Sequence, residues 1–326
     1  MTGGRVSRGK IDNFFFSCLP TAWLAVLRIG SGLAILVYAL SLREDWTYLF
    51  SGTGHGLISR NLGEQILSLD GVLIPRLGWL IGLGSYVGLS EKTVLFLTWI
   101  SLVVAGGFLI AGLFCRFSAI VAWLIHLCAA KSGGLMTYGV DNFITIALFY
   151  LMLSPLPDRY ALDQVRLRWN PRHKELLGFY RRVLQIHLCL IYFFGGITKC
   201  LGSGWWNGAN IWRAMTRPPF DIIAAEVLFK WKYFLPAAGI AICVIETGYP
   251  LFIWMRKTRL LWLLLVLGMH VMIGFSMGMF LFALIMIVLN LAAFGPDFSF
   301  NSAAILGKAA PKEHNSTEIL SNSLVP

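Results

Sequence analysis

Lys199 is the residue of this sequence with the clearest capacity for chemistry, because it directly follows a long apolar segment, residues 177–198. An ammonium at the end of a membrane helix must reach water, find a counter-charge or lose its proton, since desolvation disfavours the charged form of lysine. A lysine without its proton is a general base. The structural alternative, which is the commoner one, is a lysine that extends toward lipid headgroups.

Small and aromatic residues surround Lys199 in the sequence. Gly195 and Gly196 allow a close approach of backbone or ligand, and the segment 202–204 (Gly-Ser-Gly) permits a tight return toward the membrane. The tryptophans that follow form either an aromatic belt at the membrane interface or the wall of an apolar cofactor pocket. They are Trp205, Trp206 and Trp212.

Polar residues inside other apolar segments are candidates for the same pocket. Each is costly in lipid and is therefore expected to face the interior of a helix bundle. Their ordinary role is an interhelical hydrogen bond worth about 1 kcal/mol. The alternative is a substrate or cofactor pocket shared with Trp205 and Trp206. The candidates are Asp141, Asn142, Gln185, His187, Glu246 and His270, with Arg28 as a further polar residue early in the first apolar segment.

The cysteines predict no metal site. The chain has 6 of them, without a CxxC motif or a Cys/His pair at the spacing of metal ligands. Most lie in apolar segments, where cysteine behaves as a small apolar residue. Cys200, next to Lys199, is the one to test for reactivity, and the predicted topology gives it no second cysteine on the same side.

The elements that position these residues are predicted to be membrane helices. Hydrophobic residues make up 57% of the 326 residues, charged residues 13%, and the mean hydropathy is +0.71. A crossing of the hydrocarbon core takes about 20 helical residues. The sequence therefore predicts an all-α, polytopic membrane bundle of about eight helices. Their spans lie near 22–42, 93–113, 117–136, 139–155, 177–198, 237–255, 259–276 and 279–295.

One further apolar segment, 66–90, is interrupted by Asp70, Pro75 and Arg76. It is predicted to be a re-entrant or interfacial piece rather than a ninth crossing. The membrane domain is expected to occupy residues 21–296. It follows a cytoplasmic segment, 1–20, and precedes a disordered cytoplasmic tail, 297–326.

The distribution of basic residues predicts the orientation. With both termini in the cytoplasm, inner segments carry 16 of the 27 Lys and Arg residues and outer segments carry 10. This excess follows the positive-inside rule and places Lys199 on the outer side. The net charge of +11 is spread over segments that flank the membrane, so the expected partner is the lipid bilayer and not a nucleic acid.

Three sequence motifs are similar to one known family. The first is residues 192–199, Tyr-Phe-Phe-Gly-Gly-Ile-Thr-Lys, followed by tryptophan and by Asn-Gly at 207–208. The second is Lys-Thr-Arg at 257–259, then His270, then Ser-Met-Gly-Met-Phe at 276–280. The third is Leu-Arg-Ile at 27–29 with Gly32. Together they resemble the vitamin K-dependent gamma-carboxylases and their bacterial relatives, the horizontally transferred transmembrane (HTTM) domain proteins.

The resemblance implies a multi-pass protein of the bacterial cytoplasmic (inner) membrane with carbon–carbon lyase activity. It implies that Lys199 deprotonates a reduced quinone, menaquinone or vitamin K. Oxygen then turns the quinol anion into a base that removes a proton from a glutamate γ-carbon, to which carbon dioxide adds. This chain departs from the carboxylases in two ways. It has no large segment after the membrane region, and residues 138–143 contain no histidine where that family has one.

Three functions therefore stay open at this point. The first is a quinol-dependent, carboxylase-like enzyme that acts on a small or peptide substrate from the outer face. The second is a non-catalytic membrane partner or maturation factor for an exported peptide. The third is a small-molecule transporter in which Glu246 and His270 carry protons. The sequence has no convincing repeat with paired broken helices, which counts against transport.

Overall fold

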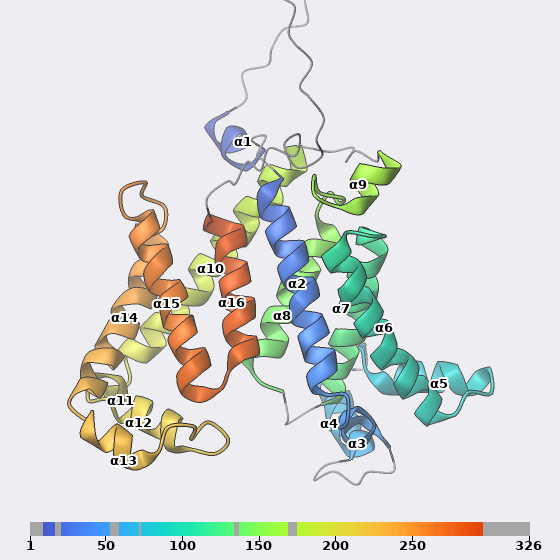
Figure 1. Ribbon diagram of the computed structural model, residues 1–326, viewed down its shortest axis with the longest axis horizontal. Helices are drawn as coiled ribbons and strands as arrows, with labels where there is room; N and C mark the ends of the chain where they lie inside the picture. Colours follow the sequence, from blue (N-terminus) through green and yellow to red (C-terminus); the bar gives the residue numbers. More distant parts are fainter. Residues whose placement is uncertain are drawn as a thin grey trace, which may run out of the picture. The chain divides into compact units, whose positions relative to one another are not determined.

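The computed structural model describes residues 9–16, 21–52, 59–71, 73–133, 137–168 and 175–295. The predicted tail, 297–326, lies outside these residues. Every regular element within them is a helix (Figure 1). The elements are α1 (Lys10–Phe15), α2 (Ala22–Ser41), α3 (Trp46–Phe50), α4 (Arg60–Asp70), α5 (Leu77–Tyr86), α6 (Glu91–Ala111), α7 (Cys115–Ser132), α8 (Gly139–Leu153), α9 (Leu162–Leu167), α10 (Glu175–Cys200), α11 (Ser203–Trp206), α12 (Ala209–Thr216), α13 (Ala225–Lys230), α14 (Phe234–Phe252), α15 (Arg259–Met277) and α16 (Phe280–Phe294).

Six of these helices are long and apolar enough to cross a membrane: α2, α6, α7, α10, α14 and α15. Each coincides with a predicted span. Two shorter apolar helices, α8 and α16, have 15 residues each and lie where the sequence predicted two more spans. The prediction of an all-helical, multi-pass membrane protein is therefore confirmed.

The interrupted segment near 66–90 contains the end of the short helix α4 and the whole of the short helix α5, which have 11 and 10 residues. At about 1.5 Å per residue, neither is long enough to cross a bilayer. The Ser59 side chain caps the start of α4 by accepting a hydrogen bond from the backbone N–H of Leu62.

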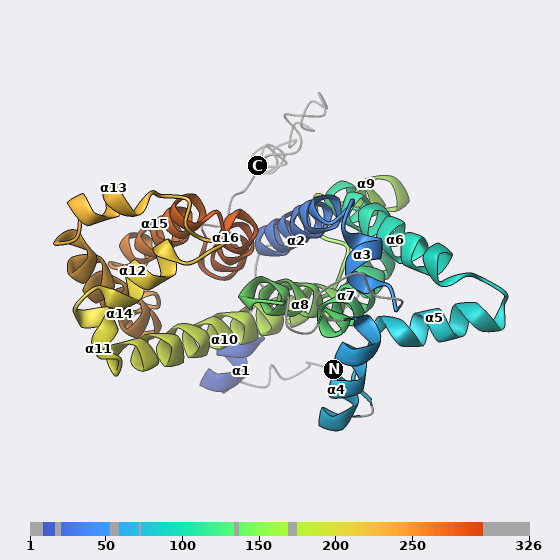
Figure 2. The same ribbon diagram turned by 90° about the horizontal axis from the view of Figure 1, so that it is seen from below.

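The six long and two shorter apolar helices form two groups of four. We call these groups the N-terminal half (α2, α6, α7, α8) and the C-terminal half (α10, α14, α15, α16). Within each half, helices that are consecutive in the chain pack against one another, as α6 does on α7 and α15 on α16. Figure 2 shows the two halves on opposite sides of the view. At the boundary between them, α16 lies beside α2. The last long helix is therefore the main link between the halves.

Glycines allow the closest helix crossings. A Cβ atom at Gly32 of α2 would lie 2.9 Å from the carbonyl oxygen of Gly106 on α6, and a Cβ atom at Gly106 would lie 3.0 Å from that of Gly32. At Gly30, two residues earlier and on another face of α2, a Cβ atom would overlap the Val288 side chain of α16. Small residues of this kind permit the close backbone contacts that hold membrane helices together.

Candidate functional site

Lys199 forms an ion pair with Glu246. Its Nζ donates a hydrogen bond of 2.5 Å to Oε2 of Glu246, which lies in the middle of α14. The two side chains are 25% and 10% exposed. The ammonium also lies 5.5 Å from the centroid of the Trp205 ring, within the range of a cation–π contact. Of the three states expected for a membrane lysine, Lys199 adopts the one with a counter-charge.

The two glycines before Lys199 make this pair possible. A Cβ atom at Gly196 would lie 2.6 Å from the backbone nitrogen of Thr247, so only glycine allows α10 to approach α14 this closely. A Cβ atom at Gly195 would lie 3.4 Å from Oε2 of Glu246. The glycines therefore bring the helices together and leave room for the carboxylate between them.

The two predicted pocket tryptophans have different positions. Trp205 of α11 faces the ammonium, as described above. Trp206 is half exposed, and its indole N–H donates to the carbonyl of Cys200 at 2.7 Å, where it satisfies the end of α10. Only the first of the two tryptophans therefore belongs to the site.

A chain of buried, hydrogen-bonded side chains runs from Tyr249 through Asn290 and Tyr192 to His270. The side-chain amide of Asn290 donates to the Tyr192 hydroxyl at 2.8 Å, and that hydroxyl lies 2.8 Å from Nε2 of His270. The Tyr249 hydroxyl donates to the other end of Asn290, also at 2.8 Å. The Tyr192 hydroxyl accepts from Asn290 and has one hydrogen to donate, and Nε2 of His270 is its acceptor when the imidazole carries its proton on Nδ1.

In that tautomer the proton is on Nδ1, a buried atom that has no hydrogen-bond partner among the residues described. His270 is 3% exposed, so bulk water does not satisfy this donor. Tyr192 lies one turn before Gly196 on α10, and Tyr249 lies three residues after Glu246 on α14, so the ion pair and the polar chain are neighbours at the α10–α14 contact. We call these residues, together with Trp205, the Lys199 site.

Gln185 and His187 lie away from the Lys199 site. They precede Lys199 on α10 by 14 and 12 residues, which is about 20 Å along a helix. The Gln185 amide donates to the carbonyl of Ala293 at 2.6 Å, and Nδ1 of His187 lies 3.1 Å from the Tyr150 hydroxyl. Both side chains thus make the interhelical hydrogen bonds that were the structural alternative for these residues.

Asp141 and Asn142 lie near the start of α8, and neither forms a hydrogen bond or ion pair with Lys199. One oxygen of Asp141 accepts the backbone N–H of Tyr138 at 3.1 Å, and the other lies 3.9 Å from Nε2 of His126. Asn142 is exposed. Asp141 also lines two cavities, of about 160 and 410 Å³. Although residues 138–143 contain no histidine, the fold brings His126 of α7 to this carboxylate.

Two clusters of charged residues in the N-terminal half were not predicted as pairs. In one, Arg28 is fully buried and its Nε lies 2.5 Å from a carboxylate oxygen of Asp158. The same guanidinium donates to the carbonyls of Leu109 and Ile110, which end α6. The cluster thus connects α2, the end of α6 and the segment before α9.

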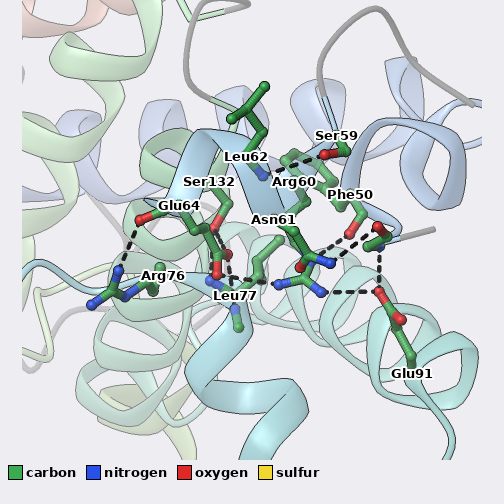
Figure 3. Close-up of polar contacts among 12 residues, drawn as sticks. Phe50, Ser59, Arg60, Asn61, Leu62, Glu64, Arg76, Leu77, Glu91 and Ser132 are labelled. Carbon is green, nitrogen blue, oxygen red and sulfur yellow. Dashed lines mark hydrogen bonds and ion pairs between the residues drawn. The ribbon is translucent and has the colours of Figure 1, made fainter. Parts of the chain in front are cut away.

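The second cluster ties α4 to the bundle (Figure 3). Arg60 donates to Glu64 at 3.2 Å, to Glu91 at 3.1 Å and to the carbonyl of Phe50 at 2.9 Å. Glu64 in turn accepts a hydrogen bond of 2.7 Å from the Ser132 hydroxyl. These side chains satisfy one another and hold α3, α4, α6 and α7 together.

Two of the cysteines, Cys200 and Cys243, are neighbours in the structure. The five cysteines within the described ranges are free, and Cys200 at the end of α10 lies beside Cys243 of α14. The sequence predicted no second outward-facing cysteine that could form a disulfide with Cys200, and Cys243 of α14 was not considered for that role. Cys243 lies inside an apolar helix, where the sequence pattern suggested only a small packing residue.

Comparisons with protein-family models, with curated proteins and with solved structures find no match for this chain. The described residues also contain no group of three or more His, Cys, Asp or Glu side chains placed to hold a metal ion. The function is therefore inferred from the Lys199 site and its surroundings.

Proposed function

We propose that this chain is a multi-pass membrane enzyme of the HTTM and vitamin K-dependent gamma-carboxylase-like family, and that the Lys199 site takes a proton from a reduced quinone. The observation that carries the proposal is the 2.5 Å contact between Lys199 and Glu246 in an apolar helix interface. Ionisable residues at such positions are costly in lipid, and they mark functional sites in membrane proteins.

The pair acts through the proton it shares. In the ion pair the proton resides on Lys199, which cannot then act as a base. Transfer along the hydrogen bond gives a neutral amine and a neutral Glu246 carboxyl group, and it removes the cost of holding two charges in a weakly polar interface. The amine is then free to accept a proton from a substrate hydroxyl.

The residues around the pair fit a reduced menaquinone or vitamin K. Such a quinol supplies an acidic hydroxyl and two electrons when bound. Trp205 offers an aromatic face, and the unpartnered Nδ1–H of His270 is a donor for a quinone oxygen. Exposed apolar side chains on α10, such as Phe193 and Phe194, form a surface along which an isoprenoid tail would lie.

The proposal includes eight crossings of the bacterial cytoplasmic membrane, with both termini inside and Lys199 on the outer side. The path of the chain supports this count, because α8 and α16 run alongside the six longer helices (Figure 1). In the same view, α3–α5 and α11–α13 lie at one end of the bundle, and α1 and α9 lie at the other. Reporter fusions at residues 160 and 215 should show cytoplasmic and external locations, respectively.

The decisive experiment is the Lys199→Arg variant. Arginine keeps the positive charge and the pairing with Glu246, but it cannot serve as a neutral base. In proteoliposomes supplied with menaquinol, oxygen and a glutamate-containing peptide, incorporation of labelled bicarbonate should fall at least about 100-fold. Lys230→Arg, at a lysine on α13, is the matched control and should retain activity.

Full activity of the Lys199→Arg variant would contradict the base role. A wild-type protein that incorporates no bicarbonate, but copurifies with an exported peptide, would favour the non-catalytic partner instead. Solute movement whose pH dependence changes in Glu246→Gln would favour the transporter. The three functions are thus separated by measurements on one purified protein.

A further inference from the structure

Cys200 and Cys243 are two free cysteines that lie beside each other across the α10–α14 interface and adjoin the Lys199 site. Cys200 is the last residue of α10 and directly follows Lys199. Cys243 precedes Glu246 by three residues, less than one turn of α14. Cys243 is 1% exposed, whereas Cys200 is partly exposed and is therefore the thiol that a reactant reaches first.

The helix register places these two residues opposite each other. The helices α10 and α14 run in opposite directions (Figure 1), and Gly196 of α10 faces Thr247 of α14. Four residues further along α10 is Cys200, and four residues back along α14 is Cys243. A shift of four residues keeps each position on the same helix face, so the facing pair recurs one turn later as the two cysteines.

Close backbone approach on both sides of the cysteines makes a disulfide feasible. On one side, the Gly196 contact leaves no room for a Cβ atom. On the other side, a Cβ atom at Gly239 would overlap the carbonyl oxygen of Trp205. A disulfide needs Cα atoms about 4.4–6.8 Å apart, and the Gly196 contact one turn from the cysteines is what allows α10 to approach α14 closely.

We propose that Cys200 and Cys243 are a dithiol that reduces a membrane quinone to the quinol used at the Lys199 site. This inference rests on the proposed function for its quinone and on the thiol contact for its chemistry. Two S–H bonds break and one S–S bond forms, and the two electrons and two protons released convert one quinone into one quinol. The Lys199–Glu246 pair lies within one turn of both sulfur atoms and transfers the protons. An external dithiol at the outer face then reopens the disulfide.

A single-turnover measurement on the full-length protein tests this step. Protein reduced and desalted without oxygen is mixed with 2,3-dimethyl-1,4-naphthoquinone, whose blocked ring positions prevent addition of a thiol to the ring. The expected result is one quinol per chain, measured by absorbance, and the loss of two of the 6 thiols, measured by maleimide labelling. A disulfide-linked peptide pair containing Cys200 and Cys243 should appear by mass spectrometry in the unmodified sequence.

Matched variants complete the test. Cys200→Ala and Cys243→Ala should each slow quinol formation at least tenfold, whereas Cys189→Ala, a buried cysteine also on α10, should leave it unchanged. Quinol formation at the wild-type rate in either cysteine variant would overturn the inference. So would a wild-type protein that forms the disulfide with diamide but not with the quinone.

The same wild-type protein separates this inference from the proposed function. When preformed quinol is supplied, incorporation of bicarbonate reports the base function alone. When quinone is supplied, the thiol count reports the dithiol alone. Failure of one reaction with success of the other therefore identifies which proposal is wrong.

Discussion

The two halves of the molecule hold buried charges in different ways. In the N-terminal half, the Arg28 guanidinium makes four hydrogen bonds, two to Asp158 and two to backbone carbonyls, and it is 0% exposed. In the C-terminal half, the Lys199 ammonium has three donors but one hydrogen-bonded counter-charge, Glu246, and it is 25% exposed. The difference teaches that burial of a charge does not by itself mark a reactive site. A charged group whose hydrogen-bond donors are not all paired with protein acceptors is the better indication of a reactive site.

The largest expected effect on stability concerns the Arg28–Asp158 pair of the N-terminal half. Arg28→Met leaves the Asp158 carboxylate buried without its partner, and it should lower the free energy of unfolding by about 3–5 kcal/mol. Thermal unfolding in detergent measures the change. The double variant Arg28→Met/Asp158→Leu should recover much of the loss because no buried charge remains.

Arg43→Met is the control, since the Arg43 side chain is 69% exposed and its pair with Glu44 should contribute less than about 1 kcal/mol. Equal stability of the Arg28 and Arg43 variants would contradict the distinction.

The next effect concerns the helix contact that builds the C-terminal site. Gly196→Val should destabilise the protein by about 1–3 kcal/mol, because the added side chain forces α10 away from α14. The same change should separate the Cys200 and Cys243 thiols and prevent their crosslinking by diamide. Gly107→Val on α6 is the matched control, because a Cβ atom there meets nothing within 4 Å. Efficient crosslinking in Gly196→Val would show that this glycine does not set the helix separation.

A smaller effect is expected from the buried polar chain. Tyr192→Phe removes the hydroxyl that Asn290 and His270 share, and it should cost about 1–2 kcal/mol in detergent unfolding. Tyr233→Phe, at a residue that is 85% exposed, should leave stability unchanged. If Tyr192→Phe unfolds like the wild-type protein, the chain from Asn290 to His270 does not hold its buried groups together.

The smallest expected stability effect belongs to Lys199 itself. Lys199→Met should change the free energy of unfolding by about 1 kcal/mol, between the values for exposed and for fully buried pairs, because solvent reaches part of the side chain. Its quinol-dependent activity should nevertheless disappear. A loss of stability as large as that of Arg28→Met would place Lys199 among the structural charges and remove the contrast between the halves.

The sequence predicted the helices well because their signal is local. All eight apolar segments form helices close to the expected bounds, since a run of apolar residues without charges reports directly on the cost of exposing a backbone to lipid. The broken segment before α6 was likewise recognised from its own Asp, Pro and Arg residues.

The candidate site was predicted only in part because its signal is not local. Lys199 and Glu246 were each identified by the cost of a charge in lipid, but 47 residues separate them in the chain, and the register set by Gly196 is what joins them. The pairing of Cys200 with Cys243 depends on that same register. Asn290 was overlooked although an amide inside the apolar α16 was an available signal. Arg28 and Asp158 lie 130 residues apart, and no pattern in the sequence connects them.

The contact between α16 and α2 has a consequence for biosynthesis. Gly30 of α2 packs against Val288 of α16, which is made more than 250 residues later. Until α16 has been made, this face of α2 lacks the helix that covers it in the folded protein. Completion of this helix contact therefore waits for the synthesis of α16, and a chain stopped before α16 would enter the membrane and yet remain open to quality-control proteases.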